Sequence, residues 1–201
     1  MNEPMNEPIV PSKIHFVKVG NGRLALNHRP RSVDFPHLRA LGCTHLVTLL
    51  REDEGAGKFR ELSKSHGINW IGLAVPNGKY PEGEVHERLV AAMPELSRLL
   101  DEGNSLMIHC SAGIHRTGMV SYALLRWRGL SPAQAMNVIG QMRKETAEGM
   151  MDKRKVWGDR VALLAPPPKR TWFESLVASA RDRLTGLLRP RQNPGKSGTK
   201  K

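Results

Sequence analysis

The residues best suited to chemistry lie in one short stretch, residues 109–118, which reads HCSAGIHRTG. An apolar run precedes it at 106–108, and apolar residues at helical spacing follow it from Met119 to Trp127. This order predicts a strand, a tight loop and a helix. Such a loop directs several backbone N–H groups at one point, and the helix dipole adds partial positive charge there, which suits an anion such as phosphate.

Cys110 opens this predicted loop and Arg116 closes it. The loop amides and the guanidinium group both stabilise negative charge, so they favour the thiolate, which is the nucleophilic form of cysteine. The guanidinium fork of Arg116 can also bind two phosphoryl oxygens at once. Gly113 is expected to let the backbone approach the phosphate closely. The stretch therefore predicts attack of a cysteine on a phosphoryl group.

This stretch resembles the signature of the cysteine-dependent protein tyrosine phosphatases. In it, His109-Cys110 is followed by five further residues and then by Arg116-Thr117-Gly118. The short chain is similar to their compact dual-specificity branch. The resemblance implies hydrolysis of phosphomonoesters on phosphotyrosine, phosphoserine or phosphothreonine of proteins, through a thiophosphate intermediate and without a cofactor. A phosphorylated protein is then the expected partner.

The resemblance also implies a role for each residue of the loop. Cys110 is the nucleophile, Thr117 supplies a hydroxyl that stabilises the departing thiolate, and His109 orders the loop. The phosphate-binding residues it implies are Ser111, Ala112, Gly113, Ile114, His115 and Arg116.

The general acid does not follow the family pattern. In the family this acid is an Asp on an upstream loop, after a strand and a Pro. Residues 70–78 resemble that segment, and Asn77 stands at the position of the Asp. An amide cannot donate a proton as an acid, and the loss of general acid catalysis costs about 10²–10⁴-fold in rate.

Three hypotheses follow from Asn77. Glu82 or Glu84 could act as a substitute acid if the loop that carries them moves. The substrate could instead have a good leaving group, as in a phosphoanhydride at an RNA 5′ end, or be a phosphoinositide. The third hypothesis is a slow module that binds phosphorylated partners as a trap. The sequence leaves the three open.

The elements that must position these residues alternate between strand and helix patterns. The predicted strands are two between 14 and 26 with a turn at 20–22, one at 45–50 and one at 69–75, besides the one before Cys110. The predicted helices are 34–41 capped by Ser32 or Asp34, 58–66, 84–100 with a kink or restart at Pro94, 132–142 and 152–164. This alternation predicts an α/β fold, a central, mostly parallel sheet flanked by helices, with ligands at the carboxyl ends of its strands.

The composition is that of a globular protein with an unusual charge. The chain has 201 residues, 39% of them hydrophobic, and a formal net charge of +12. Its two cysteines argue against a disulfide scaffold and for a reducing compartment. Cys43 is predicted to be a core residue, with a resolving thiol for Cys110 as the alternative. The eight histidines show no metal-ligand spacing, and no nucleic-acid module is recognised.

Three segments make up the predicted chain. Residues 1–11 begin with a duplicated Met-Asn-Glu-Pro and are predicted to be a disordered leader, and residues 12–165 form the catalytic domain. Residues 166–201 begin with three prolines and carry nine Lys/Arg against two Asp/Glu, predicting a basic amphipathic helix and a disordered tail. The stripe at 171–189 could pack on the domain, an anionic membrane surface or a partner protein. With no apolar run of ~18 residues, the predicted location is cytoplasmic.

Overall fold

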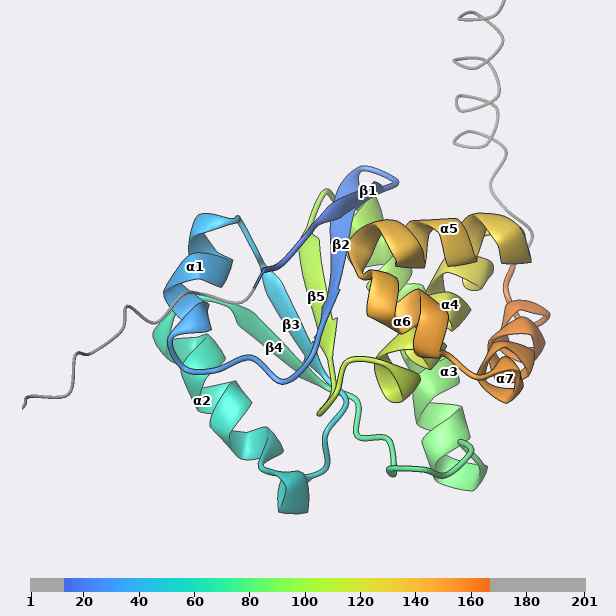
Figure 1. Ribbon diagram of the computed structural model, residues 1–201, viewed down its shortest axis with the longest axis horizontal. Coiled ribbons are helices and arrows are strands. Elements are labelled where there is room, and N and C mark those ends of the chain that lie inside the picture. Colours follow the sequence, from blue (N-terminus) through green and yellow to red (C-terminus); the bar gives the residue numbers. More distant parts are fainter. Residues whose placement is uncertain (1–12, 167–201) are drawn as a thin grey trace, which may run out of the picture. The chain divides into compact units, whose positions relative to one another are not determined.

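The computed structural model describes residues 13–166 (Figure 1). The predicted leader at 1–11 and the predicted basic helix and tail that follow Pro166 lie outside the described residues. Within the described residues, no helix combines the length and the apolar character that crossing a bilayer requires.

A five-stranded sheet forms the centre of the described domain. Its strands are β1 (Val17–Val19), β2 (Gly22–Asn27), β3 (His45–Thr48), β4 (Asn69–Gly72) and β5 (Ser105–His109), in the order β1-β2-β5-β3-β4. β1 pairs antiparallel with β2, and every other pair is parallel. All five residues of the central strand β5 are buried, because helices cover both faces of the sheet, so its run of apolar side chains has no solvent-facing side.

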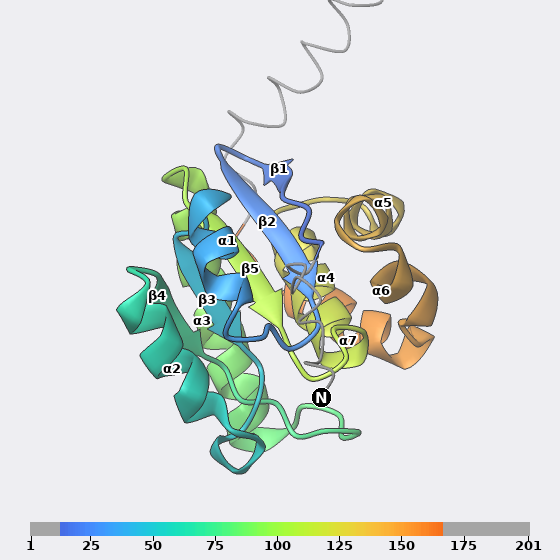
Figure 2. The ribbon, with the colours of Figure 1, turned by 60° about the vertical axis from the view of Figure 1, so that its left-hand side comes forward.

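Helices form a layer on each face of this sheet (Figures 1 and 2). α1 (Asp34–Ala40) and α2 (Ala56–Ser65) lie on one face, and a short 3₁₀ turn, η1 (Glu52–Glu54), precedes α2. The opposite layer contains α3 (Gly83–Asp101), α4 (His115–Trp127), α5 (Pro132–Met142), α6 (Lys144–Gly149) and α7 (Asp152–Ala162). The predicted fold class, a mostly parallel sheet flanked by helices, is confirmed.

The predicted side-chain cap of the helix at 34–41 was wrong, the helix predicted at 84–100 does not restart at Pro94, and one helix was not predicted. The residue that caps α1 is Val33, which offers no side-chain hydrogen bond, while Asp34 is the first helical residue and accepts from the Arg31 backbone N–H at 2.7 Å. α3 continues through Pro94 without a restart, because its buried face, which includes Leu89 and Met93, keeps the helix packed on the domain, and the predicted kink stays a prediction. α6 was not predicted at all.

The strand register brings four loops together at one edge of the sheet. His109, the last residue of β5, pairs with Asn27 of β2 and with Thr48 of β3, and Thr48 pairs in turn with Gly72 of β4. Because these four strands are parallel and end level with one another, the loops at 28–33, 49–55, 73–82 and 110–114 all leave from the same edge. The loop that begins at Cys110 therefore lies at the carboxyl ends of the strands, as predicted.

Cys43 lies at the other end of the sheet from Cys110. Cys43 precedes β3, whose first residue His45 pairs with Leu106 near the start of β5, whereas Cys110 follows the last residue of β5. The four residues from Leu106 to Cys110 alone span about 13 Å at ~3.3 Å per residue, and a disulfide needs Cα atoms within ~7 Å. Burial also raises the pKa of the Cys43 thiol to about 11. Cys43 is a core residue, and the resolving-thiol hypothesis is wrong.

Candidate active site

The loop between β5 and α4 curls around the sulfur of Cys110. The backbone N–H of Gly113 donates to Cys110 Sγ at 3.2 Å, and Cys110 is 3% exposed. Ser111 and Ala112 are exposed, so the loop faces solvent on one side. The Gly113 N–H is thus one loop donor directed at the sulfur of the predicted nucleophile.

The structure gives a reason for Gly113 that the sequence did not suggest. Its φ is +70°, and a Cβ added there would lie 2.4 Å from the backbone of Asn27 and His28. The absent side chain therefore lets the loop pack against the end of β2. The close approach of the Gly113 backbone to phosphate stays a prediction.

α6 holds the loop from its outer side. Arg143 Nη1 donates to the carbonyl oxygens of Ala112 and Gly113 at 3.1 and 2.9 Å, and Thr146 Oγ1 donates to the Gly113 oxygen at 2.6 Å. Across a trans peptide the C=O and the next N–H point in opposite directions. Binding of the Ala112 carbonyl from outside is thus consistent with the Gly113 N–H pointing inward, to Cys110 Sγ. Sequence reasoning missed both residues because they act on the loop from a separate, unpredicted helix.

Replacing Thr146 with valine tests this support. Thr146 is fully buried, and valine keeps its shape without the hydroxyl. We expect a loss of about 1–3 kcal/mol in the free energy of unfolding, because a buried hydrogen bond is removed, and a decrease of roughly tenfold in kcat/KM as the loop loosens. Urea unfolding and steady-state hydrolysis of an aryl phosphate, measured at a temperature where the variant is folded, provide the two values. Thr146→Ser retains the hydroxyl and should retain most of the activity; equal losses in both variants would contradict the assignment.

Arg116 is almost completely buried and is held by a dense set of acceptors. Its side chain is 3% exposed and forms a two-point ion pair with Glu54, with Nη1 to Oε2 at 2.7 Å and Nη2 to Oε1 at 2.9 Å. Nη1 also donates to Val75 O at 3.1 Å, and Nη2 donates to Ser111 Oγ at 3.1 Å. A guanidinium fixed in this way has its orientation set before any phosphate arrives.

Glu54 is a site residue that sequence reasoning missed. η1 places it: its Oε2 accepts from the Arg51 backbone N–H at 3.1 Å, which turns the carboxylate back toward the sheet edge. The Arg116 hydrogen bonds are the main cause that lowers its pKa below the usual 4.5. A signal was present in the sequence, because Glu54 follows a buried strand of an α/β fold and a buried arginine needs a counter-charge.

Glu54→Gln is expected to change how stability depends on pH. A carboxyl whose pKa is lower in the folded protein stabilises it above about pH 4.5, and this contribution is lost as pH falls through the folded pKa. The variant should therefore be less stable than wild type by about 1–3 kcal/mol at pH 7, and the difference should shrink below pH 4.5. Urea unfolding at pH 7 and at pH 4 measures it. A difference that is the same at both values would exclude an ionised Glu54 as the cause.

His109 is buried beneath the loop in a short polar chain. The indole N–H of Trp70 donates to Thr48 Oγ1 at 2.9 Å, and the same oxygen lies 2.9 Å from His109 Nε2. Burial lowers the pKa of His109 to about 3, so the ring is neutral at physiological pH. A neutral ring hydrogen-bonded to β3 fits the predicted role of ordering the loop.

The remaining loop residues fall into two groups. Thr117 is buried at the start of α4, and its hydroxyl makes no hydrogen bond with any residue from 13 to 166. The predicted role of this hydroxyl toward the Cys110 thiolate stays a prediction. His115 is exposed and Ile114 is half-buried, so both can line the mouth of the site.

The loop that carries Asn77 is anchored beside Arg116. Val75 O accepts from Arg116, and the carbonyl oxygens of Ala74 and Lys79 accept from Arg88 and Arg154 at 2.7 and 2.6 Å. Asn77 lies between these anchors and is exposed. The structure thus brings the segment that resembles the general-acid loop to the site.

Glu82 and Glu84 are not brought into contact with the Cys110 loop. Both are exposed at the start of α3, where Glu82 is the residue before the first helical turn. Glu54 is the carboxylate that does reach the site, but its lowered pKa keeps it ionised and unable to donate a proton. Among residues 13–166, no three His, Cys, Asp or Glu side chains gather closely enough to hold a metal ion.

Comparison with known proteins agrees with this geometry. Residues 14–159 match the family model described as Swiss Army Knife protein, DSP-PTPase phosphatase domain. A mutant form of Tk-PTP has a TM-score of 0.59 at 22% identity, covering 71% of this chain and 91% of that one. The kinase associated phosphatase KAP, with its catalytic-site cysteine replaced by serine, has a TM-score of 0.59 at 20% identity, covering 77% and 94%.

Two further structures share the fold at lower identity. PTPMT1 in complex with PI(5)P has a TM-score of 0.60 at 14% identity and covers 75% of this chain and 96% of that one. The catalytic core of the PP-IP phosphatase SIW14 from S. cerevisiae, in complex with citrate, has a TM-score of 0.55 at 15% identity and covers 87% and 96%. The family match spans most of the described residues, and so the chain is a phosphatase of the cysteine-dependent protein tyrosine phosphatase superfamily, a member of the compact dual-specificity-like family of Swiss Army Knife DSP-PTPase domains.

Proposed function

We propose that this protein hydrolyses phosphomonoesters in two steps through a phosphocysteine at Cys110, and that it does so without a positioned general acid. The observation that carries the proposal is the cradle around Cys110 Sγ, with the Gly113 N–H at 3.2 Å on one side and the fixed guanidinium of Arg116 closing the loop. This arrangement presents a nucleophile and phosphate-binding donors to the same point.

The proposed first step transfers the phosphoryl group to sulfur. The thiolate of Cys110 attacks phosphorus, the S–P bond forms, the P–O bond breaks, and the leaving oxygen takes its proton from water. The amides of residues 111–116 and Arg116 hold the phosphoryl oxygens as their charge shifts. In the second step water attacks phosphorus, the S–P bond breaks, inorganic phosphate leaves, and the Thr117 hydroxyl stabilises the thiolate that is released.

Substrate preference follows from the absent acid. Without a proton donor the leaving oxygen departs as an anion, so esters of acidic alcohols react faster. A phenol such as tyrosine ionises near pH 10, far more readily than the alcohols of serine and threonine. We therefore propose phosphotyrosine proteins as preferred protein substrates over phosphoserine and phosphothreonine. A phosphoanhydride would react without protonation as well, and slow turnover of other esters would make the protein a phosphate-dependent trap.

A series of aryl phosphates tests both parts of this proposal. The rate of phosphocysteine formation should fall steeply as the pKa of the leaving phenol rises, because no acid neutralises the developing charge. Rapid quenching and mass spectrometry of the Cys110 peptide should detect the intermediate. A rate that does not depend on the phenol would show that an acid is present after all, and failure to trap phosphate on Cys110 would reject the mechanism.

Substitution of the two nearby carboxylates tests the substitute-acid hypothesis directly. Glu82→Gln and Glu84→Gln should leave the rates within twofold of wild type, because neither side chain contacts the Cys110 loop. Glu87→Gln, an exposed residue of the same helix, is the matched control. A decrease of about 10²-fold in either of the first two variants, on phosphotyrosine peptides alone, would identify the acid instead.

A further inference from the structure

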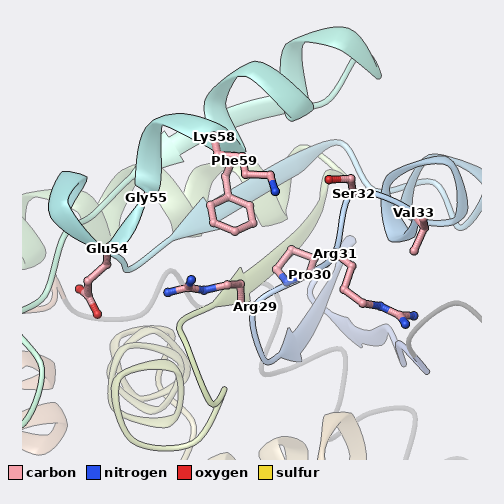
Figure 3. Close-up of a pocket in the computed structure, with 9 residues that line it drawn as sticks. All are labelled: Arg29, Pro30, Arg31, Ser32, Val33, Glu54, Gly55, Lys58 and Phe59. Atoms are coloured by element: carbon pink, nitrogen blue, oxygen red, sulfur yellow. The ribbon is translucent and has the colours of Figure 1, made fainter.

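A second hollow lies beside the Cys110 loop, between α2 and the chain that follows β2 (Figure 3). Its volume is about 600 Å³. Arg29 and Pro30 form one wall, Lys58 and Phe59 form the other, and Glu54 lies at the end nearest the site. This hollow is called the Arg29–Lys58 pocket below.

The pocket presents two cations that carboxylates do not neutralise. In Figure 3 the Arg29 guanidinium extends toward Glu54 and the Lys58 amine points into the space between the two walls. Within residues 13–166 neither side chain forms an ion pair: the only hydrogen bond of the Arg29 side chain goes to Ser111 Oγ at 3.4 Å. Arg31 points away from Glu54 and pairs with Asp34.

The carboxylate that lines this pocket, Glu54, already has an ion-pair partner. Glu54 directs both carboxylate oxygens at Arg116, so it neutralises the buried guanidinium of the catalytic loop and not the pocket cations. Arg29 and Lys58 lie on opposite walls of the pocket, and the pocket is consequently positive. Two neighbouring cations that remain unpaired favour a ligand with two negative charges.

Ser111 connects the pocket to the predicted phosphate site. Its Oγ accepts from Arg116 Nη2 at 3.1 Å and from Arg29 Nη2 at 3.4 Å. The Arg29 backbone N–H also donates to Ser111 O at 3.0 Å. The guanidinium that would bind the reacting phosphoryl group and the guanidinium that lines the pocket thus lie on two sides of a single oxygen atom. A molecule with two adjacent phosphoryl groups is large enough to reach both.

We propose that the Arg29–Lys58 pocket binds a second phosphoryl group of the substrate, next to the one that Cys110 attacks. The inference rests on the proposed function, and it narrows the substrate class to compounds with two phosphoryl groups close together. It also accounts for Asn77, because a leaving group that carries phosphate held by two cations needs less help from a proton donor. Arg29 and Lys58 then determine which phosphate esters bind productively.

Ligand binding to the Cys110→Ser variant tests this pocket without requiring turnover. The ligands are inorganic phosphate, methylenebisphosphonate and phosphonoacetate, measured by titration calorimetry at constant ionic strength. Methylenebisphosphonate should bind at least tenfold more tightly than phosphate, and phosphonoacetate should gain much less. Arg29→Gln and Lys58→Gln, each added to Cys110→Ser, should reduce the advantage of the bisphosphonate about tenfold, the usual effect of one charged hydrogen bond.

Lys64→Gln is the matched control, because Lys64 is an exposed lysine of the same helix outside the pocket and the change in net charge is the same. The proposed second phosphate site would be contradicted if Cys110→Ser bound methylenebisphosphonate no more tightly than inorganic phosphate. It would also be contradicted if Lys64→Gln reduced that difference in affinity as much as Arg29→Gln and Lys58→Gln do. An equal gain for phosphonoacetate would show a general anion site and would overturn it too. Loss of aryl phosphate hydrolysis by the wild-type protein is a separate result, which would reject the proposed function and not the pocket.

Discussion

Cys110→Ser is expected to abolish turnover, by on the order of 10⁵-fold or more, while the protein still binds oxyanions. A serine hydroxyl is not ionised at neutral pH and cannot replace the thiolate as the attacking group. The donors that bind phosphate are the loop amides and Arg116, and these remain in place because serine is close to cysteine in size. Steady-state hydrolysis of an aryl phosphate and the affinity for inorganic phosphate measure the two properties.

Arg116→Ala provides the contrast to the cysteine variant. It removes the guanidinium that would grip the phosphoryl oxygens, so turnover and phosphate affinity should both be lost. It also leaves Glu54 without the partner that lowers its pKa. A partly buried carboxylate that has lost its ion-pair partner destabilises the folded protein. Circular dichroism should therefore accompany both assays. Turnover that persists in Cys110→Ser would reject Cys110 as the nucleophile.

Asn77→Asp is expected to raise the rate on poor leaving groups by about 10²–10⁴-fold, the usual contribution of a general acid. The position lies two residues after Val75, whose carbonyl oxygen accepts from Arg116 at 3.1 Å, and we expect a carboxyl there to reach the leaving oxygen. Phosphotyrosine and phosphoserine peptides should show the gain, and an aryl phosphate with a very acidic phenol should show little. Steady-state kinetics on the three substrates gives the comparison.

The pH profile distinguishes a true acid from a general improvement. A carboxyl that acts as a proton donor must be protonated, so the rate of Asn77→Asp should fall as pH rises above its pKa, whereas wild type should lack this descending limb. Asn77→Ser, which cannot donate a proton as an acid, should resemble wild type. Equal rates for Asn77→Asp and wild type on every peptide would mean that another group already supplies the proton.

The sequence by itself determined the fold class and the centre of the site. Strand and helix periods alternate clearly along residues 14–164. The residues that define the candidate site, 109–118, are consecutive, so their types and spacing are visible in the sequence. A strand, a tight loop and a helix start are set by neighbouring residues, so they can be read without the rest of the chain. The alternation also placed Cys110 at the carboxyl edge of the sheet, which the register of β5 with β2 and β3 confirms.

Only the tertiary structure decided which distant residues complete that loop. Glu54 reaches Arg116 across 62 residues and Thr146 reaches Gly113 across 33, and nothing in the local pattern of either segment encodes its partner. The separation of Cys43 from Cys110 and the position of Arg29 and Lys58 in one pocket depend in the same way on strand order. Pairing between strands and packing between helices are non-local, so the contacts that orient a site are known only when the whole domain has folded.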